Sequence, residues 1–311
     1  EAGLERNTAN YKSNLTAGFY NIKAVTFHHL SNLDSALTYY LKAVAELEAR
    51  NDTAKAASIR FNIGNIFLSY RDWEQANKHF KLFLDVIERE KDSTYLAGVL
   101  SSLSATQFEM GNEKQSRIYA EKGLRVAKKR NDALGQMLSY RQLGQIANNN
   151  NHLDSAIQYY SSALEIAEMI KMPYYLAMIN MNLCEAYGKA GQTEAAIECG
   201  KSSLKYSEDP GFATQLPAAY RFLSEAYRQK GDFANAHKYL SLSTELRDEE
   251  INEENKKIVN ELLVKYESEK KDRQIVEQKL QISQKEKQNF IYLAAVVFAI
   301  LVIGFLVWLM G

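Results

Sequence analysis

The sequence predicts an all-α protein, in which a solenoid of about six helix hairpins is followed by a coiled-coil stalk and one transmembrane helix. Three observations favour this fold class. The 311 residues include only 3 Pro and 15 Gly, so residues that break helices are rare. Small residues recur over most of the chain with a period of about 40 residues, a length within the range of helical repeats. Residues 290–311 carry no charge.

The four predicted parts follow one another along the chain without overlap. Residues 1–16 are expected to form a helical cap, and residues 17–245 the solenoid of six repeats. Residues 246–289 are rich in Glu, Lys, Gln and Asn and are expected to form a charged stalk. Residues 290–311 are the predicted transmembrane helix.

Each predicted hairpin brings two small residues together where its helices cross. Helices pack at about 8–10 Å when the residues at their contact are small. One set lies on the second helices, at intervals of one repeat: Ala36, Ala76, Ser116, Ala156, Ala196 and Ala236. The other set lies twelve positions earlier, on the first helices: Ala24, Gly64, Ser104, Gly144, Cys184 and Ser224. Turn-forming pairs such as Arg71-Asp72 and Gly231-Asp232 separate the two helices of a hairpin.

The spacing of these positions resembles the tetratricopeptide repeat. The second unit matches it at Ile63-Gly64, Phe67, Ala76 and Phe80, and the fourth at Leu143-Gly144, Ala156 and Tyr160. The period of about 40 exceeds the usual ~34, and the usual Trp near the repeat start is missing. The resemblance implies a right-handed solenoid that binds proteins or peptides, and it does not specify which ones.

The first helices of such a solenoid line its concave face, where ligands usually bind. The repeat places twelve polar residues there: Asn21, Asn62, Asn65, Ser101, Arg141, Gln142, Gln145, Asn182, Glu185, Arg221, Glu225 and Arg228. Eight of them form the candidate ligand-binding set: Asn62, Asn65, Arg141, Gln145, Asn182, Glu185, Arg221 and Glu225.

Two interpretations of this polar face stay open. In the first, carboxamides bind the backbone of an extended peptide or of a partner's tail, and Arg binds a carboxylate. Arrays with this period resemble bacterial peptide-pheromone receptors, in which concave Asn residues hold the peptide backbone. The Lys and Asn clamp of chaperone-tail binders is not matched here. In the second interpretation, the face is an ordinary solvated helix surface.

No pattern predicts catalysis, a cofactor or a metal site. The sequence lacks a phosphate-binding loop, a zinc-protease helix motif and Cys or His at zinc spacing. Cys184 and Cys199 are expected to be buried thiols, with a disulfide as the alternative. His28 and His29 fit a solvated helix end. The net charge of 0 argues against a nucleic acid partner.

The predicted stalk has a discontinuous heptad pattern. Val259, Leu262, Tyr266, Val276 and Leu280 follow heptad spacing, although charged residues interrupt the seam. This pattern predicts a homodimer through the stalk. A single charged helix, stabilised by pairs four positions apart, is the alternative.

The uncharged segment 290–311, FIYLAAVVFAILVIGFLVWLMG, is expected to form a helix that crosses a lipid bilayer. Such a helix is roughly 33 Å long, and the hydrocarbon core is about 30 Å thick. Tyr292 and Trp308 lie near its ends, where aromatic rings favour the interface.

The order of solenoid, stalk and span leads to two functional hypotheses. In the first, the solenoid is periplasmic or otherwise extracytoplasmic, a leader precedes Glu1, and an output domain follows Gly311. That order resembles membrane-tethered bacterial tetratricopeptide sensors, which continue into a histidine kinase or a helix-turn-helix regulator. In the second, the chain is a tail-anchored adaptor whose solenoid lies on the cytosolic face.

Overall fold

The computed structural model describes residues 2–30, 32–91, 94–206, 215–246, 268 and 271–292, with side chains from Leu15 onward. Every regular element in these ranges is a helix, which confirms the predicted all-α class. The labelled helices are α1 (Ala2–His29), α2 (Leu33–Glu48), α3 (Thr53–Ser69), α4 (Trp73–Arg89), α5 (Leu96–Glu109), α6 (Glu113–Arg130), α7 (Ala133–Asn149), α8 (Leu153–Ile170), α9 (Pro173–Lys189), α10 (Thr193–Lys205), α11 (Leu216–Lys230) and α12 (Phe233–Glu245).

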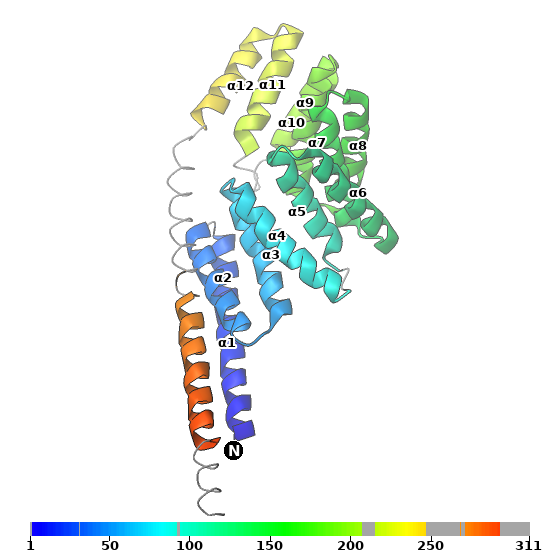
Figure 1. Cartoon of the computed structure of the whole chain (residues 1–311). Helices are drawn as coiled ribbons and strands as arrows, with labels where there is room; N and C mark the ends of the chain where they lie inside the picture. Colours follow the sequence, from blue (N-terminus) through cyan, green and yellow to red (C-terminus); the bar gives the residue numbers. More distant parts are fainter. Residues whose placement is uncertain are drawn as a thin grey trace, which may run out of the picture. The chain divides into compact units, whose positions relative to one another are not determined.

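Consecutive helices pair as hairpins, and the hairpins stack in chain order from α1–α2 to α11–α12 (Figure 1). First helices of neighbouring hairpins also contact one another, as α5 does with α7 and α9 with α11. Neighbouring second helices make no comparable contact in the described part of the chain. The stack therefore curves, with its first helices on the inner, concave side, as a solenoid does.

The small residues mark the closest approach of the paired helices. Gly144 lies so close to the buried ring of Tyr160 that an added Cβ would stand 2.6 Å from it, and Gly64 stands in the same relation to Phe80. In the third hairpin each of Ser104 and Ser116 donates its hydroxyl to the other's carbonyl oxygen, at 2.8 Å in both cases. The predicted crossing points are therefore confirmed in these hairpins.

The ends of the helices repeat at half the period of the hairpins. Asp52, Asp72, Asp132 and Asp232 cap the helices that follow them by accepting a backbone N–H. Left-handed residues with φ between 52° and 83° end the preceding helices, and those described recur at multiples of this half period: Asn51, Arg71, Lys91, Gly111, Asn131, Asn151, Lys171, Gly191 and Gly231. From α2 to α12 the helices are therefore between 13 and 18 residues long.

The chain divides into two compact units, Glu1–Lys256 and Lys257–Gly311. In the first unit, residues 2–16 of the predicted cap belong to α1, which continues to His29. The last hairpin ends at Glu245, the predicted end of the solenoid. In the second unit, residues 271–292 are helical, and Val276 and Leu280 are exposed. Stalk pairing stays a prediction, because Val259, Leu262 and Tyr266 lie outside the described residues.

None of the described helices is both long and apolar enough to cross a membrane. The predicted span, residues 290–311, is described only in its first three residues. The transmembrane helix therefore stays a prediction from the sequence.

Candidate ligand-binding face

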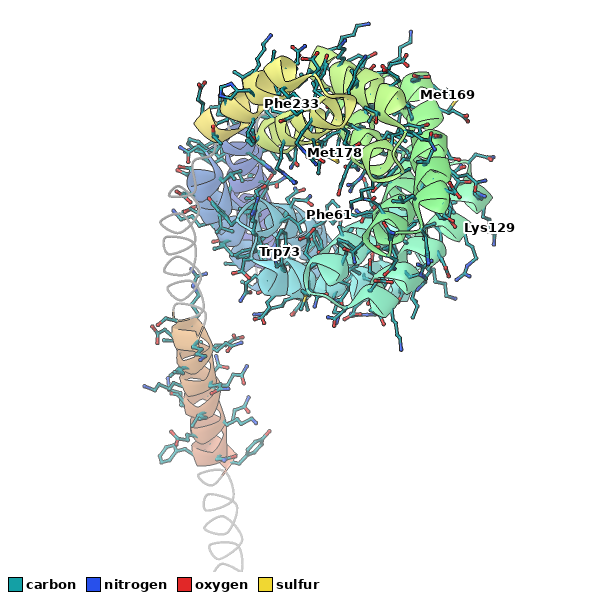
Figure 2. All side chains as sticks on the ribbon, turned by 90° about the horizontal axis from the view of Figure 1, so that it is seen from above. Phe61, Trp73, Lys129, Met169, Met178 and Phe233 are labelled. Carbon is teal, nitrogen blue, oxygen red and sulfur yellow. The ribbon has the colours of Figure 1, made fainter. Side chains whose placement is uncertain are left out.

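All eight candidate residues lie on first helices. Asn62 and Asn65 are on α3, Arg141 and Gln145 on α7, Asn182 and Glu185 on α9, and Arg221 and Glu225 on α11. Figure 2 shows the inner side of the array through Phe61 of α3 and Met178 of α9, which point toward its centre. Lys129 of α6 and Met169 of α8 lie on the outer side in the same view. The face is thus assembled from several hairpins.

Five candidates share an unusual state. They are half-buried, and their side chains make no hydrogen bond or ion pair with any residue that the structure describes: Asn62, Asn65, Arg141, Gln145 and Asn182. Among their polar atoms only Nε of Arg141 is fully buried without a partner, and burial of such an atom is unfavourable unless a partner replaces the lost water. These side chains therefore retain unused capacity for hydrogen bonds.

Arg141 and Glu185 approach the same buried ring. Burial raises the pKa of Tyr160 well above its usual value, while Arg141 lowers it and Glu185 raises it further. Arg141 also opposes the effect of burial on the pKa of Tyr175. Glu185 forms an ion pair with Lys189 of its own helix at 2.8 Å, which leaves the guanidinium of Arg141 without a carboxylate among the described residues. The structure therefore brings the unpaired guanidinium of Arg141 on α7 near Tyr160 of α8 and Tyr175 of α9.

The two candidates on α11 are in a different state. Arg221 is exposed, and its guanidinium carbon lies 4.4 Å from the ring centre of Phe222. Glu225 accepts a hydrogen bond from Nε of Arg228 at 2.8 Å and another from Gln229. The bond from Arg228 is the main reason why the pKa of Glu225 is lowered. Glu225 is therefore already occupied, whereas Arg221 is available to a ligand.

Two of the twelve residues projected onto the face are not accessible there, so the sequence interpretation was wrong for them. Ser101 is 4% exposed and Gln142 is 1% exposed. The close contact of α5 with α7 covers these positions, because neighbouring first helices approach one another on the inner side. Both atoms of the Gln142 amide lack a partner among the described residues.

Apolar residues near the polar set were missed at the sequence level. The ring of Phe61 lies 5.4 Å from that of Phe80 and 5.3 Å from that of Phe83. Met178 and Met181 form a cluster with Ala219 of α11. Phe61 and Met181 occupy the same repeat position as Arg141. A comparison of this position across the repeats would therefore have identified them. Met178 and Met181 are only 8% and 6% exposed, so among these residues the half-buried ring of Phe61 is the one that adds an accessible apolar contact to the face.

The described residues contain no group of three or more His, Cys, Asp or Glu that could hold a metal ion. Cys184 and Cys199 are free thiols on facing helices. Burial raises the pKa of Cys184 to about 12 and that of Cys199 to about 11, so both are poor nucleophiles at neutral pH.

Comparison with known proteins supports the repeat class. The tetratricopeptide repeat family model matches residues 139–168, within the α7–α8 hairpin. No curated protein matches the sequence. The solenoid resembles the crystal structure of BtubC from P. vanneervenii, with a TM-score of 0.55 and 16% identity over 70% of this chain and 91% of that one. It also resembles a Rap protein complexed with Competence and Sporulation Factor, with a TM-score of 0.61 and 14% identity over 82% of this chain and 79% of that one.

A third similar structure is aspartyl phosphate phosphatase F from Bacillus subtilis, with a TM-score of 0.59 and 13% identity over 79% of this chain and 74% of that one. At these identities the likeness is one of fold. The described array is therefore a tetratricopeptide-like solenoid, and its ligand has to be argued from its own residues.

Proposed function

We propose that the chain is a non-catalytic binding protein whose concave face holds an extended peptide or the tail of a partner protein. One observation carries the proposal: five half-buried polar side chains of the face have no partner among the described residues. A peptide backbone offers donors and acceptors at regular intervals, as carboxamides require. A carboxylate of the ligand would form an ion pair with the guanidinium of Arg141.

The structural neighbours support a binding role without specifying it. One of the similar structures is a Rap protein in complex with Competence and Sporulation Factor. The half-buried ring of Phe61, which points toward the centre of the array, would contact a side chain of a bound peptide between its polar contacts. A solvated polar surface would not need both kinds of residue at inner positions.

We further propose that the array is the sensor part of a single-pass membrane signalling protein. The uncharged residues 290–311 and the charged stalk before them support a rigid connection to a bilayer. A ligand on the concave face would change stalk pairing or orientation. The tail-anchored adaptor is the alternative, and the sequence beyond Gly311 distinguishes the two.

Selection from a random peptide library tests the binding proposal. The full chain, purified in detergent, would be used to select peptides, and their affinities would be measured by fluorescence anisotropy. Arg141→Ala and Asn182→Ala should each weaken binding by about tenfold, the effect of a lost charged or buried hydrogen bond. The control Lys129→Ala, on the outer side of α6, should leave the affinity unchanged. Equal affinities for all four proteins would reject the concave site.

A further inference from the structure

Two arginines occupy one repeat position on the concave face. Arg141 of α7 and Arg221 of α11 stand two repeats apart in the sequence. Phe61 of α3 stands at the same repeat position, and its ring points toward the centre of the array (Figure 2). Both arginines therefore belong to the inner side of the solenoid.

Neither guanidinium has an anionic partner among the residues that the structure describes. Nε of Arg141 is buried without a hydrogen bond, in a side chain that is half-buried as a whole. Arg221 is exposed, and its guanidinium carbon lies over the ring of Phe222 at 4.4 Å. A carboxylate is the matching partner for such a group, because its two oxygens can accept two parallel N–H bonds. Both positions therefore favour an acidic group of the ligand.

The acidic residues of the same inner helices are already paired. On α7, α9 and α11 they are Glu185 and Glu225. Glu185 pairs with Lys189 of its own helix at 2.8 Å, and Glu225 accepts a hydrogen bond from Nε of Arg228 at 2.8 Å. The inner side of these three helices thus keeps two unpaired positive charges, although the whole chain has a net charge of 0.

One intervening helix sets the distance between the two arginines. α9 contacts both α7 and α11. Helices in contact lie about 8–10 Å apart, so the two arginines stand about 20 Å apart along the array. About six residues of an extended chain span that distance. Asn182 of α9 is half-buried and makes no hydrogen bond with a described residue, so its carboxamide can bind the peptide backbone in between.

We propose that the ligand of the concave face is an extended acidic peptide, in which two acidic side chains about six residues apart bind Arg141 and Arg221. This ligand class rests on the proposed binding function of the same face. A neutral peptide would satisfy the carboxamides and leave both guanidinium groups unpaired. A basic peptide would be repelled by them.

Four synthetic peptides of equal length test the proposal. Each consists of Ser, Thr and Gln around two variable residues, and both ends are blocked so that only side chains carry charge. Three peptides carry glutamates, lysines or glutamines six residues apart, and the fourth carries two adjacent glutamates. Their affinities for the full chain, purified in detergent, would be measured by fluorescence anisotropy at several salt concentrations.

The peptide with widely spaced glutamates should bind about tenfold more tightly than the glutamine peptide, and the lysine peptide should bind most weakly. It should also bind about threefold more tightly than the peptide with adjacent glutamates, because only the wide spacing reaches both arginines. The differences should shrink as the salt concentration rises.

Arginine variants locate the contact. In Arg141→Gln or Arg221→Gln the two spacings of glutamate should bind equally, and in the double variant both should bind like the glutamine peptide. The matched control, Arg125→Gln with Lys129→Gln at exposed positions of α6, should change nothing. Arg221→Gln should unfold at the wild-type temperature, because Arg221 is exposed.

Three results would overturn the proposal. If the peptide with widely spaced glutamates bound no better than the glutamine peptide, the ligand would not be acidic. If both spacings of glutamate bound equally to the wild type, the two arginines would not act together. Tight binding that required a free C-terminal carboxylate in place of the second glutamate would assign that contact to a chain end. In each case, peptides selected from the random library would still bind if the proposed function holds.

Discussion

At the scale of single residues, the small residues at the helix crossings define the fold most sharply. Gly144 leaves no room for a methyl group, because the ring of Tyr160 occupies the place of a Cβ. Tyr160 is 1% exposed and cannot move toward solvent. The hairpin α7–α8 therefore depends on the absence of a side chain at this position.

Gly144→Ala should accordingly destabilise the protein by about 1–3 kcal/mol through overpacking, measured by urea unfolding. Gly98→Ala on α5 is the matched control, because nothing lies within 4 Å of an added Cβ there. It should be neutral or should stabilise by up to about 1 kcal/mol through helix propensity. Similar losses for both variants would contradict the packing described here.

A buried histidine makes stability depend on pH. His79 is 3% exposed and stacks on Phe67 at 5.4 Å. Burial, with the positive charges of Arg60 and Lys78, lowers its pKa to about 3. The unfolded chain binds this proton near pH 6.5, so the contribution of His79 is complete above that pH and decreases as the pH falls toward 3.

His79→Phe should remove that dependence. Between pH 8 and pH 5 the wild type should lose about 2 kcal/mol more than the variant, because each pH unit below the unfolded pKa of 6.5 removes about 1.4 kcal/mol. Urea unfolding at the two pH values gives the change in stability of each protein. The effects of the other titrating groups cancel when the two changes are subtracted. Parallel losses would show that His79 is protonated in the folded protein.

Single residues also show which part of the concave face could not be predicted from the sequence. The repeat period located Asn182 and Arg141 on the concave side, but it treated Gln142 as accessible. Whether such a side chain faces the ligand or the neighbouring first helix depends on how far the hairpins rotate between repeats. That rotation results from packing across several hairpins, and no local pattern encodes it.

At the scale of helices, the ends are set by short local signals that the sequence displays plainly. Asp72 and Asp232 were predicted in turns and cap helices. Polar contacts between neighbouring hairpins, in which a donor of the later hairpin meets a carboxylate of the earlier one, were not predicted, although the sequence carries their signal. Tyr70, Asn150 and Lys230 each follow their acceptors by 36 or 37 residues.

Some helix ends carry backbone strain that substitution can relieve. Lys171 adopts a left-handed conformation with φ of 53°, where a Cβ is unfavourable. Lys171→Gly should therefore stabilise the protein by about 1 kcal/mol in thermal or urea unfolding. Lys129→Gly, within the last turn of α6, should destabilise it by up to about 1 kcal/mol. A loss of stability in both variants would contradict the left-handed helix end.

At the scale of the whole array, the proposed binding face depends on curvature. No single hairpin could present Asn62, Arg141 and Asn182 to one ligand, since these residues lie on three different first helices. Stacking of the hairpins places these first helices on the inner side of the array. The proposed binding face thus results from one repeated packing arrangement.

The most direct test of this account is the site at which a selected peptide crosslinks to the chain. A peptide from the library, carrying a photoreactive group, would be irradiated with the full chain, and the linked residues would be identified by mass spectrometry. The account predicts linkage to the first helices, α3, α7, α9 and α11. Linkage confined to the outer helices α4, α6, α8 and α10 would contradict the concave binding face.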